Sequence, residues 1–211
     1  MKLAKYIDHT LLKADASLIA IKKLCDEAKE YDFKSVCVNP CNIEFCKNEL
    51  KESDVLVCCV IGFPLGAMST EAKVFEAKDA VEKGADEVDM VINIGRLKDN
   101  NLEYCTEEIR KIKQAIGDKT LKVIVETCLL TEQEIVNACN CVVDAGADFV
   151  KTSTGFSTAG ATFEAVSLMK KTVGDKCFIK AAGGVRSHED MLKMIELGAN
   201  RIGTSSGTKL I

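Results

Sequence analysis

The chain has 211 residues, of which 47% are hydrophobic and 28% are charged, and its formal net charge at pH 7 is −4. This length suits one sizeable hydrophobic core and is short for two, so we expect a single domain over residues 1–211. The mildly acidic balance argues against generic binding to nucleic acid, which requires a basic surface.

Predicted strands and helices alternate along the whole chain. Short apolar runs predict strands at about residues 6–8, 35–38, 55–61, 87–91, 121–126, 149–151, 178–180 and 201–203. Longer helix-like segments predict helices at about residues 17–31, 40–50, 70–83, 102–116, 132–145, 162–172 and 187–197. Ser69 and Thr131 stand at N-cap positions, and Glu134 completes a capping box with Thr131.

A helix-like stretch, a turn that begins Gly-Ala and a short apolar run recur in that order three times, with turns beginning at Gly84, Gly146 and Gly198. Glycine suits the left-handed backbone position at a helix C-terminus. Strands that alternate with helices imply a parallel sheet, and eight strands without a linker predict an α/β fold, a TIM (β/α)8 barrel with a truncated C-terminal helix. A doubly wound open sheet is the alternative. That fold normally has a glycine-rich turn after its first strand, and residues 9–12 contain no glycine.

The eleven cysteines lie mostly inside apolar runs, and the N-terminal segment lacks the apolar core of a secretion signal. We therefore expect reduced, buried thiols in a cytoplasmic protein rather than a disulfide scaffold. Cys37, Cys41 and Cys46 lie close together, but their spacing from the two histidines, His9 and His188, matches no common zinc pattern. We therefore expect no metal site. No membrane is expected as a partner either, since no run approaches the roughly 20 apolar residues that span a bilayer.

The predicted strand ends carry several ionisable residues, and in a barrel these ends face the mouth of the active site. They are Asp8, Asp89, Glu126, Lys151 and Lys180, with Lys122 earlier on its strand. Lysine is rarely fully buried unless it is paired, so two strands that end in lysine are unusual for packing alone. A neutral lysine forms a Schiff base with a carbonyl, and Lys180 would supply the nearby positive charge that favours neutral Lys151. A structural lysine paired with Asp or Glu inside the barrel fits the same pattern, and the spacing leaves both interpretations open.

Asp89 and two glycine clusters complete the pattern. A carboxylate at Asp89 would move protons at the substrate carbon or form a salt bridge with one of the lysines, and the two roles are compatible.

Gly183 and Gly184 follow the seventh predicted strand, and residues 203–207 follow the eighth. The corresponding loops of a barrel often hold phosphate through backbone N–H groups and hydroxyls, although either cluster alone would also suit a flexible loop.

Eight segments of the chain resemble deoxyribose-phosphate aldolases, and the resemblance runs from residue 6 to about residue 206. The segments are residues 7–11, 38–40, 62–66, 87–93, 122–127, 149–156, 180–186 and 201–206. The resemblance implies a class I aldolase that needs no metal or other cofactor. It would reversibly split 2-deoxy-D-ribose 5-phosphate into acetaldehyde and D-glyceraldehyde 3-phosphate during the breakdown of deoxyribonucleosides.

The resemblance also implies roles for residues of this chain. Lys151 matches the lysine that forms the Schiff base. Lys180 matches the lysine that perturbs that amine and assists proton transfer, and Asp89 matches the proton donor or acceptor. The positions that match substrate-binding residues are Asp8, Thr10 and Lys122 around the reacting carbons and hydroxyls, and Gly155, Gly183, Gly184, Ser205 and Ser206 at the phosphate. A homodimer is expected as well. Two alternatives are a Schiff-base aldolase for another sugar phosphate and a barrel that binds a phosphorylated sugar without catalysis.

Overall fold

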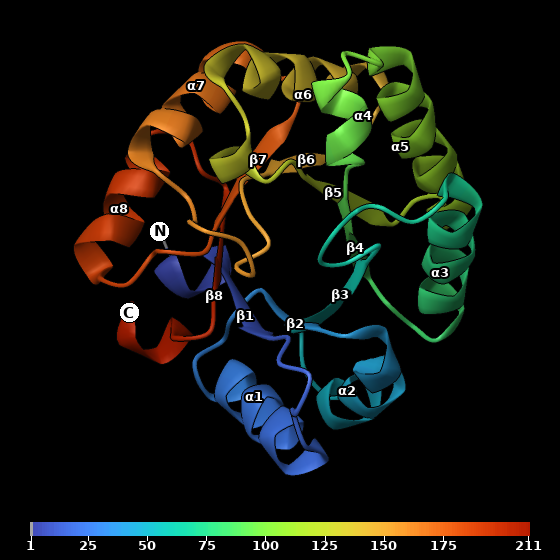
Figure 1. The fold of residues 1–211 in the computed structure, drawn as a ribbon. Coiled ribbons are helices and arrows are strands. Elements are labelled where there is room, and N and C mark those ends of the chain that lie inside the picture. The colour runs from blue at the N-terminus through green and yellow to red at the C-terminus, as the bar shows by residue number, and fades with distance from the viewer. Residues whose placement is uncertain (1) are drawn as a thin grey trace.

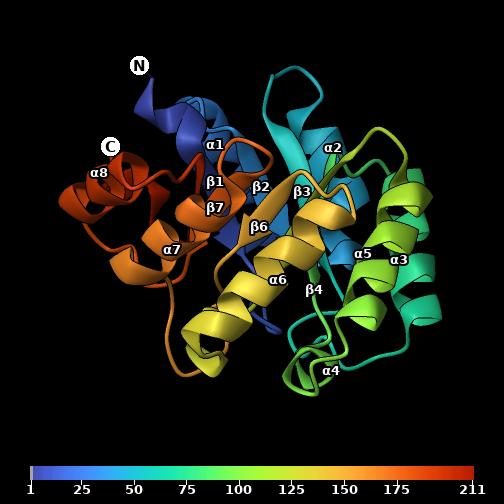
Figure 2. The same cartoon turned by 90° about the horizontal axis from the view of Figure 1, so that it is seen from above.

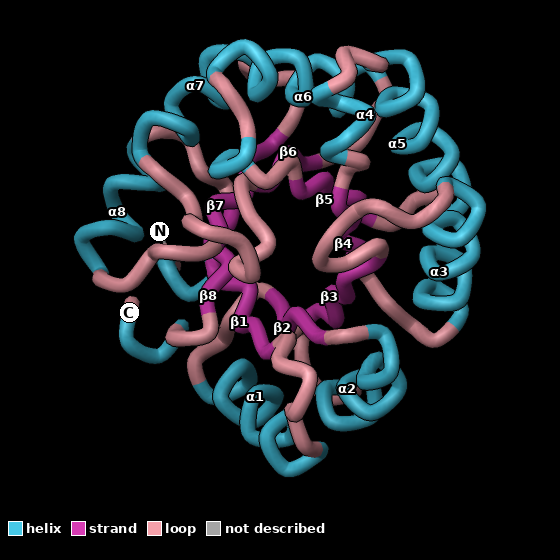
Figure 3. Tube along the Cα trace, in the orientation of Figure 1, coloured by secondary structure: helices cyan, strands magenta, loops and turns pink. Residues whose placement is uncertain are grey.

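The computed structural model of this chain describes residues 2–211. Eight parallel strands close into a barrel in chain order, and the helices form a ring outside it (Figure 1, Figure 3). The strands are β1 (Ile7–Leu11), β2 (Ser35–Val38), β3 (Leu56–Ile61), β4 (Glu87–Val91), β5 (Thr120–Ile124), β6 (Phe149–Lys151), β7 (Phe178–Ala182) and β8 (Arg201–Thr204). The helices are α1 (Leu18–Glu30), α2 (Ile43–Leu50), α3 (Thr70–Glu82), α4 (Ile94–Lys98), α5 (Leu102–Ile116), α6 (Glu132–Asp144), α7 (Phe163–Val173) and α8 (His188–Glu196).

The predicted (β/α)8 barrel is confirmed, with local differences. The short helix α4 was not predicted, and it lies beyond the C-terminal end of β4, at the opposite end of the barrel from the N-terminus (Figure 2). The fifth strand was predicted to reach residue 126 but ends at Ile124, and Glu126 adopts a left-handed backbone with φ of 58°. After β8 the chain forms only the 3-10 turn η4 (Gly207–Lys209) where a truncated helix was predicted.

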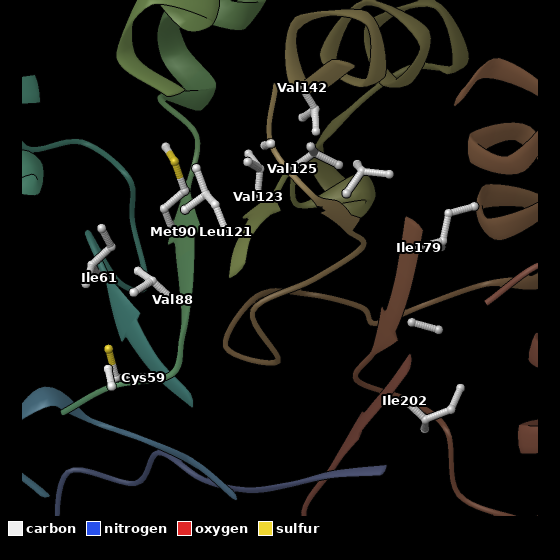
Figure 4. Close-up of a cluster of buried hydrophobic side chains, with 14 of the residues drawn as sticks. Cys59, Ile61, Val88, Met90, Leu121, Val123, Val125, Val142, Ile179 and Ile202 are labelled. Atoms are coloured by element: carbon white, nitrogen blue, oxygen red, sulfur yellow. The ribbon is translucent and has the colours of Figure 1, made fainter. Parts of the chain in front are cut away.

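Alternate residues of each strand face the helices and pack there as the main hydrophobic core. Figure 4 shows part of this layer, with Val88 and Met90 of β4 beside Leu121 and Val123 of β5. The other residues of each strand face the inside of the barrel, where many of them are ionisable. Because successive side chains of a strand point to opposite faces, the same strands build both the core and the interior of the barrel.

The predicted helix caps are present. Ser69 Oγ accepts a hydrogen bond from the backbone N–H of Ala72 at 3.2 Å, which starts α3. Thr131 and Glu134 form the predicted capping box, with each side chain accepting from the other's backbone N–H at the start of α6. None of the helices within residues 2–211 combines the length and the apolar character that crossing a bilayer requires.

Replacement of Thr131 by alanine removes one half of this capping box. We expect Thr131→Ala to lower the free energy of unfolding by about 1 kcal/mol, because an N–H at the helix start loses its acceptor. Thr131→Ser keeps the hydroxyl and should retain most of the stability. Urea unfolding followed by circular dichroism would measure both variants, and equal midpoints for alanine and serine would contradict a stabilising role for the cap.

Candidate active site

Within residues 2–211, seven acidic or basic side chains lie buried inside the barrel. They are Asp8, Glu87, Asp89, Lys122, Lys151, Lys180 and Arg201. Three carboxylates therefore face four basic groups in a region from which water is excluded. Buried charges are tolerated only when they are paired, so the geometry of the pairs decides whether this interior is stable.

Asp89 takes part in more of these pairs than either of the other two carboxylates. Its Oδ2 accepts from Lys151 Nζ at 2.8 Å and from Lys180 Nζ at 2.7 Å, and its Oδ1 accepts from Lys122 Nζ at 2.9 Å. Burial by itself would raise the pKa of Asp89, but the three lysines offset it and hold the pKa well below its usual range. Asp89 is therefore an ionised carboxylate, suited to accept a proton rather than to donate one.

Asp8 and Arg201 close the network on the other side of the barrel. Asp8 Oδ2 lies 2.6 Å from Lys180 Nζ, and Asp8 Oδ1 accepts hydrogen bonds from Arg201 and from Ser35 Oγ. Burial opposes ionisation of Asp8, yet the positive charges of Arg201 and Lys180 keep its pKa below the usual value. Glu87 accepts from Lys122 Nζ at 2.7 Å and from Arg201 at 2.9 Å, which joins the two halves.

Lys180 remains protonated between two carboxylates. Burial alone would lower the pKa of Lys180, but Asp8 and Asp89 outweigh burial and raise it above its usual value. Lys180 and Lys151 both donate to Asp89 Oδ2, so the positive charge of Lys180 lies close to the Lys151 side chain.

A cavity of about 460 Å³ opens above this network at the C-terminal ends of the strands. Seven of the predicted site residues line it: Thr10, Lys151, Gly155, Gly183, Gly184, Ser205 and Ser206. Four predicted site residues do not line it and lie buried beneath: Asp8, Asp89, Lys122 and Lys180. Among the described residues, Lys151 is the one member of the buried ionic network that reaches the cavity.

The loops after β6 and β7 pack directly against each other at one side of the cavity. Gly155, Gly183 and Gly184 have φ of 84°, 73° and 81°, a region that favours glycine. A Cβ on Gly160 would lie 2.3 Å from the carbonyl carbon of Gly183, so only glycine fits there. The backbone N–H of Ala161 donates to Gly183 O at 2.8 Å, which fixes the two loops together.

Glu87 and Arg201 belong to the network but were not predicted as members of the site. Glu87 precedes Asp89 by two residues, and Arg201 precedes Gly203 by two, so strand periodicity places each on the inner face. That signal was available in the sequence, but the partners of each residue were not, because Glu87 and Arg201 are 114 positions apart.

Glu126 and the two histidines lie outside the network. Glu126 is buried and accepts hydrogen bonds from the backbone N–H and the hydroxyl of Thr154, so it holds the start of the loop that carries Gly155. His9 Nε2 lies 2.7 Å from Glu27, and His188 Nδ1 lies 2.5 Å from the carbonyl oxygen of Leu210. Neither histidine lines the cavity.

One group of buried side chains could in principle hold a metal. Cys37, Cys58 and Asp89 each offer a ligand atom, and these atoms lie within 4.8 Å of one another. However, Asp89 already accepts hydrogen bonds from three lysine side chains, and Lys122 and Lys180 are held protonated, so a cation there would face positive charge at close range. The charge distribution disfavours metal binding at this position.

Comparison with known proteins relates the chain to one family of enzymes. Residues 2–209 match the model of the DeoC/LacD family of aldolases. The deoxyribose-phosphate aldolase of Finegoldia magna is 61% identical over 211 residues, which covers 100% of this chain and 99% of that protein. An aldolase named QR15 has a solved structure that is 42% identical, with a TM-score of 0.95, and the match covers 99% of this chain and 93% of that chain.

A third similar protein is described as a tetramer. The solved structure of the deoxyribose phosphate aldolase of Aeropyrum pernix is 32% identical, with a TM-score of 0.90. The match covers 99% of this chain and 88% of that chain.

Breaking the buried network should destabilise the fold strongly. Arg201→Met leaves Asp8 and Glu87 without their guanidinium partner, and we expect the free energy of unfolding to fall by about 3–5 kcal/mol. The matched control is Arg110→Met, which removes an exposed ion pair with Glu107 and should have little effect. Urea unfolding would compare the two variants, and equal losses would show that the buried network adds no more stability than a surface ion pair.

The lowered pKa values of Asp8 and Asp89 also predict how stability depends on pH. A carboxylate whose pKa is lowered on folding stabilises the protein above its unfolded pKa, near 4, and this contribution disappears as the pH falls. We therefore expect the free energy of unfolding to fall steadily as the pH drops below about 4. The fall should be shallower in Asp8→Asn, which has one fewer such carboxylate. Parallel acid-side slopes for the two proteins, from urea unfolding at several pH values, would contradict this assignment.

Proposed function

The chain belongs to the DeoC/LacD family of aldolases, and on this premise we propose that it cleaves 2-deoxy-D-ribose 5-phosphate through a Schiff base on Lys151. The products are acetaldehyde and D-glyceraldehyde 3-phosphate, and the reaction is reversible. Identity of 61% over the full chain to a deoxyribose-phosphate aldolase supports this substrate. The structural observation that carries the mechanism is that Lys151, among the residues that the structure describes, is the one member of the buried ionic network that lines the cavity.

The first step joins Lys151 to the substrate. The uncharged amine attacks C1 of the open-chain sugar, and loss of water gives a protonated imine. Three carboxylates face four basic groups inside the barrel, so one uncharged amine leaves the network electrically balanced. Lys151 is the basic group that meets the substrate, and Asp89 Oδ2 lies 2.8 Å from its Nζ, close enough to accept a proton.

The second step breaks the bond between C2 and C3. The hydroxyl on C3 loses its proton, the electron pair of the bond moves toward the imine, and D-glyceraldehyde 3-phosphate leaves. The remaining enamine takes a proton at C2, and water then releases acetaldehyde and free Lys151. We assign proton transfer to Lys180 and Asp89, whose side chains are joined by a 2.7 Å hydrogen bond. Asp89 acts as the acceptor because its carboxylate is ionised and lies within hydrogen-bonding distance of both lysines.

Asp8 and Lys122 act on this reaction through other side chains. Neither lines the cavity, and neither shares Asp89 Oδ2 with Lys151 as Lys180 does, so we assign them to holding Asp89 and Lys180 in place. Thr10 lines the cavity, and its hydroxyl donates to the carbonyl oxygen of Asp8 at 2.9 Å. Thr10 is therefore the residue of this set placed to meet a substrate hydroxyl.

The phosphate is assigned to the glycine-rich side of the cavity. Gly155, Gly183 and Gly184 bring backbone close to the open space, and Ser205 and Ser206 add hydroxyls. Backbone N–H groups without a neighbouring side chain form concave sites for anions.

The homodimer expected from the resemblance stays a prediction, which light scattering of the purified protein would check.

Trapping the imine tests the mechanism directly. The protein is incubated with acetaldehyde, reduced with borohydride and digested, and the modified peptide is mapped by mass spectrometry. We expect a stable N-ethyl group on Lys151, because reduction converts the imine into a secondary amine. Lys151→Ala should lose this product, whereas the control Lys176→Ala removes an exposed lysine before β7 and should keep it.

Cleavage of the sugar phosphate then tests the substrate. Wild-type protein should release acetaldehyde from 2-deoxy-D-ribose 5-phosphate, and Lys151→Ala should be inactive. An adduct on Lys151 without cleavage of this sugar phosphate would favour a Schiff-base aldolase with another substrate. If the folded protein forms no adduct on Lys151, this result would contradict the mechanism and favour a barrel that only binds a phosphorylated sugar.

A further inference from the structure

One positive side chain at the mouth of the cavity has no part in the network below. Lys13 lies between β1 and α1, lines the cavity and is exposed. Within residues 2–211 its ammonium group has no hydrogen bond or ion pair with another side chain. Lys13 and Lys151 are the charged residues among those that line the cavity, and no carboxylate lines it. The rim therefore carries one positive charge that nothing in the described chain neutralises.

Lys13 lies on the same side of the mouth as the glycine-rich loops. The barrel is closed by pairing of β8 with β1, so β6, β7, β8 and β1 follow one another around the ring (Figure 1). The segments after these strands carry Gly155, Gly183, Ser205 and Lys13 in the same order. Lys151, by contrast, lies at the floor of the cavity. An elongated substrate that reacts at Lys151 would thus direct its far end toward this arc of loops.

The loops alone do not distinguish a phosphate from an uncharged group. Backbone N–H groups and serine hydroxyls can bind any good acceptor, whereas an ammonium group favours a full negative charge. The chain has a net charge of −4, so its overall field does not attract anions. A local cation is needed for that, and Lys13 is the one placed at the rim.

We propose that Lys13 binds the phosphate group of the substrate and sets the preference of this aldolase for phosphorylated over unphosphorylated sugars. The inference rests on the proposed function and extends it to a residue outside the reacting centre. The flexible stem and exposed position of Lys13 allow its ammonium to meet the phosphate after the sugar enters. Because the contact lies at the surface, dissolved salt weakens it.

The test compares two substrates on the same variants. Lys13→Met should lower kcat/KM for 2-deoxy-D-ribose 5-phosphate about tenfold, mainly by raising KM, as loss of a charge-assisted hydrogen bond predicts. The same variant should cleave unphosphorylated 2-deoxy-D-ribose at the wild-type rate, since the reacting residues are untouched. Lys13→Arg should keep most of the preference, and Lys13→Glu should lose more than Lys13→Met.

Two controls separate the local contact from a change in net charge. Lys176→Met removes the same charge from an exposed residue before β7, at the opposite end of the barrel, and should leave both substrates unaffected. Inorganic phosphate should inhibit cleavage of the unphosphorylated sugar, and Lys13→Met should raise its inhibition constant about tenfold. Added potassium chloride should reduce the preference of the wild type but not that of Lys13→Met.

The possible outcomes distinguish this inference from the proposed function. Wild-type protein that cleaves neither sugar would contradict the proposed function, and the role of Lys13 would fall with it. An active wild type with the same substrate preference as Lys13→Met would overturn the role of Lys13 alone. Equal losses on both sugars would also overturn it, because they would place Lys13 in the reaction or in the fold rather than at the phosphate.

Discussion

The carboxylate of Asp89 is the constraint on which the rest of this structure depends. It accepts hydrogen bonds from three lysines on three neighbouring strands, β5, β6 and β7, all inside the barrel. A lysine buried without a partner would be strongly unfavourable, so each strand must keep the register that brings its lysine to this carboxylate. Asp89 pairs with Lys122 across β4 and β5, and Lys151 pairs with Lys180 across β6 and β7. Closure of the barrel and assembly of the site are therefore one requirement.

The buried ionic groups and the cavity lie at different depths in the barrel. The ionic groups lie beneath the cavity, and within residues 2–211 Lys151 is the one member of the network that also lines the cavity. Burial keeps these charges close to the Lys151 side chain and away from water, which strengthens their effect. The rim, built from glycine-rich loops and Lys13, carries no ionic link to the network in the part of the chain that the structure describes. Under the proposed function, the far end of the substrate would meet groups that are separate from the buried network.

Gly203 shows how one residue serves both regions. Gly203 was predicted at the end of the eighth strand and in the glycine cluster that follows it, and it is the third residue of β8 and faces inward. A Cβ at this position would lie 3.0 Å from Cε of Lys180, so glycine leaves room for that side chain to cross toward Asp89. The same glycine also lines the cavity. The absence of a side chain at Gly203 therefore leaves room both for Lys180 and for the cavity above it.

The sequence by itself determined the barrel, the position of Lys151 at a strand end and the glycine clusters on adjacent strands, because each of these depends on local periodicity and composition. The sequence could not determine how deep each side chain lies below the cavity. Asp8 and Lys122 matched substrate-contacting positions, yet they lie below the cavity, since depth depends on strand register and barrel closure. Nor could it pair Glu87 with Arg201, which meet only when the first and last strands join. Local pattern identified the residues, and the tertiary structure decided which of them line the cavity and which pair with one another, because only barrel closure fixes those positions.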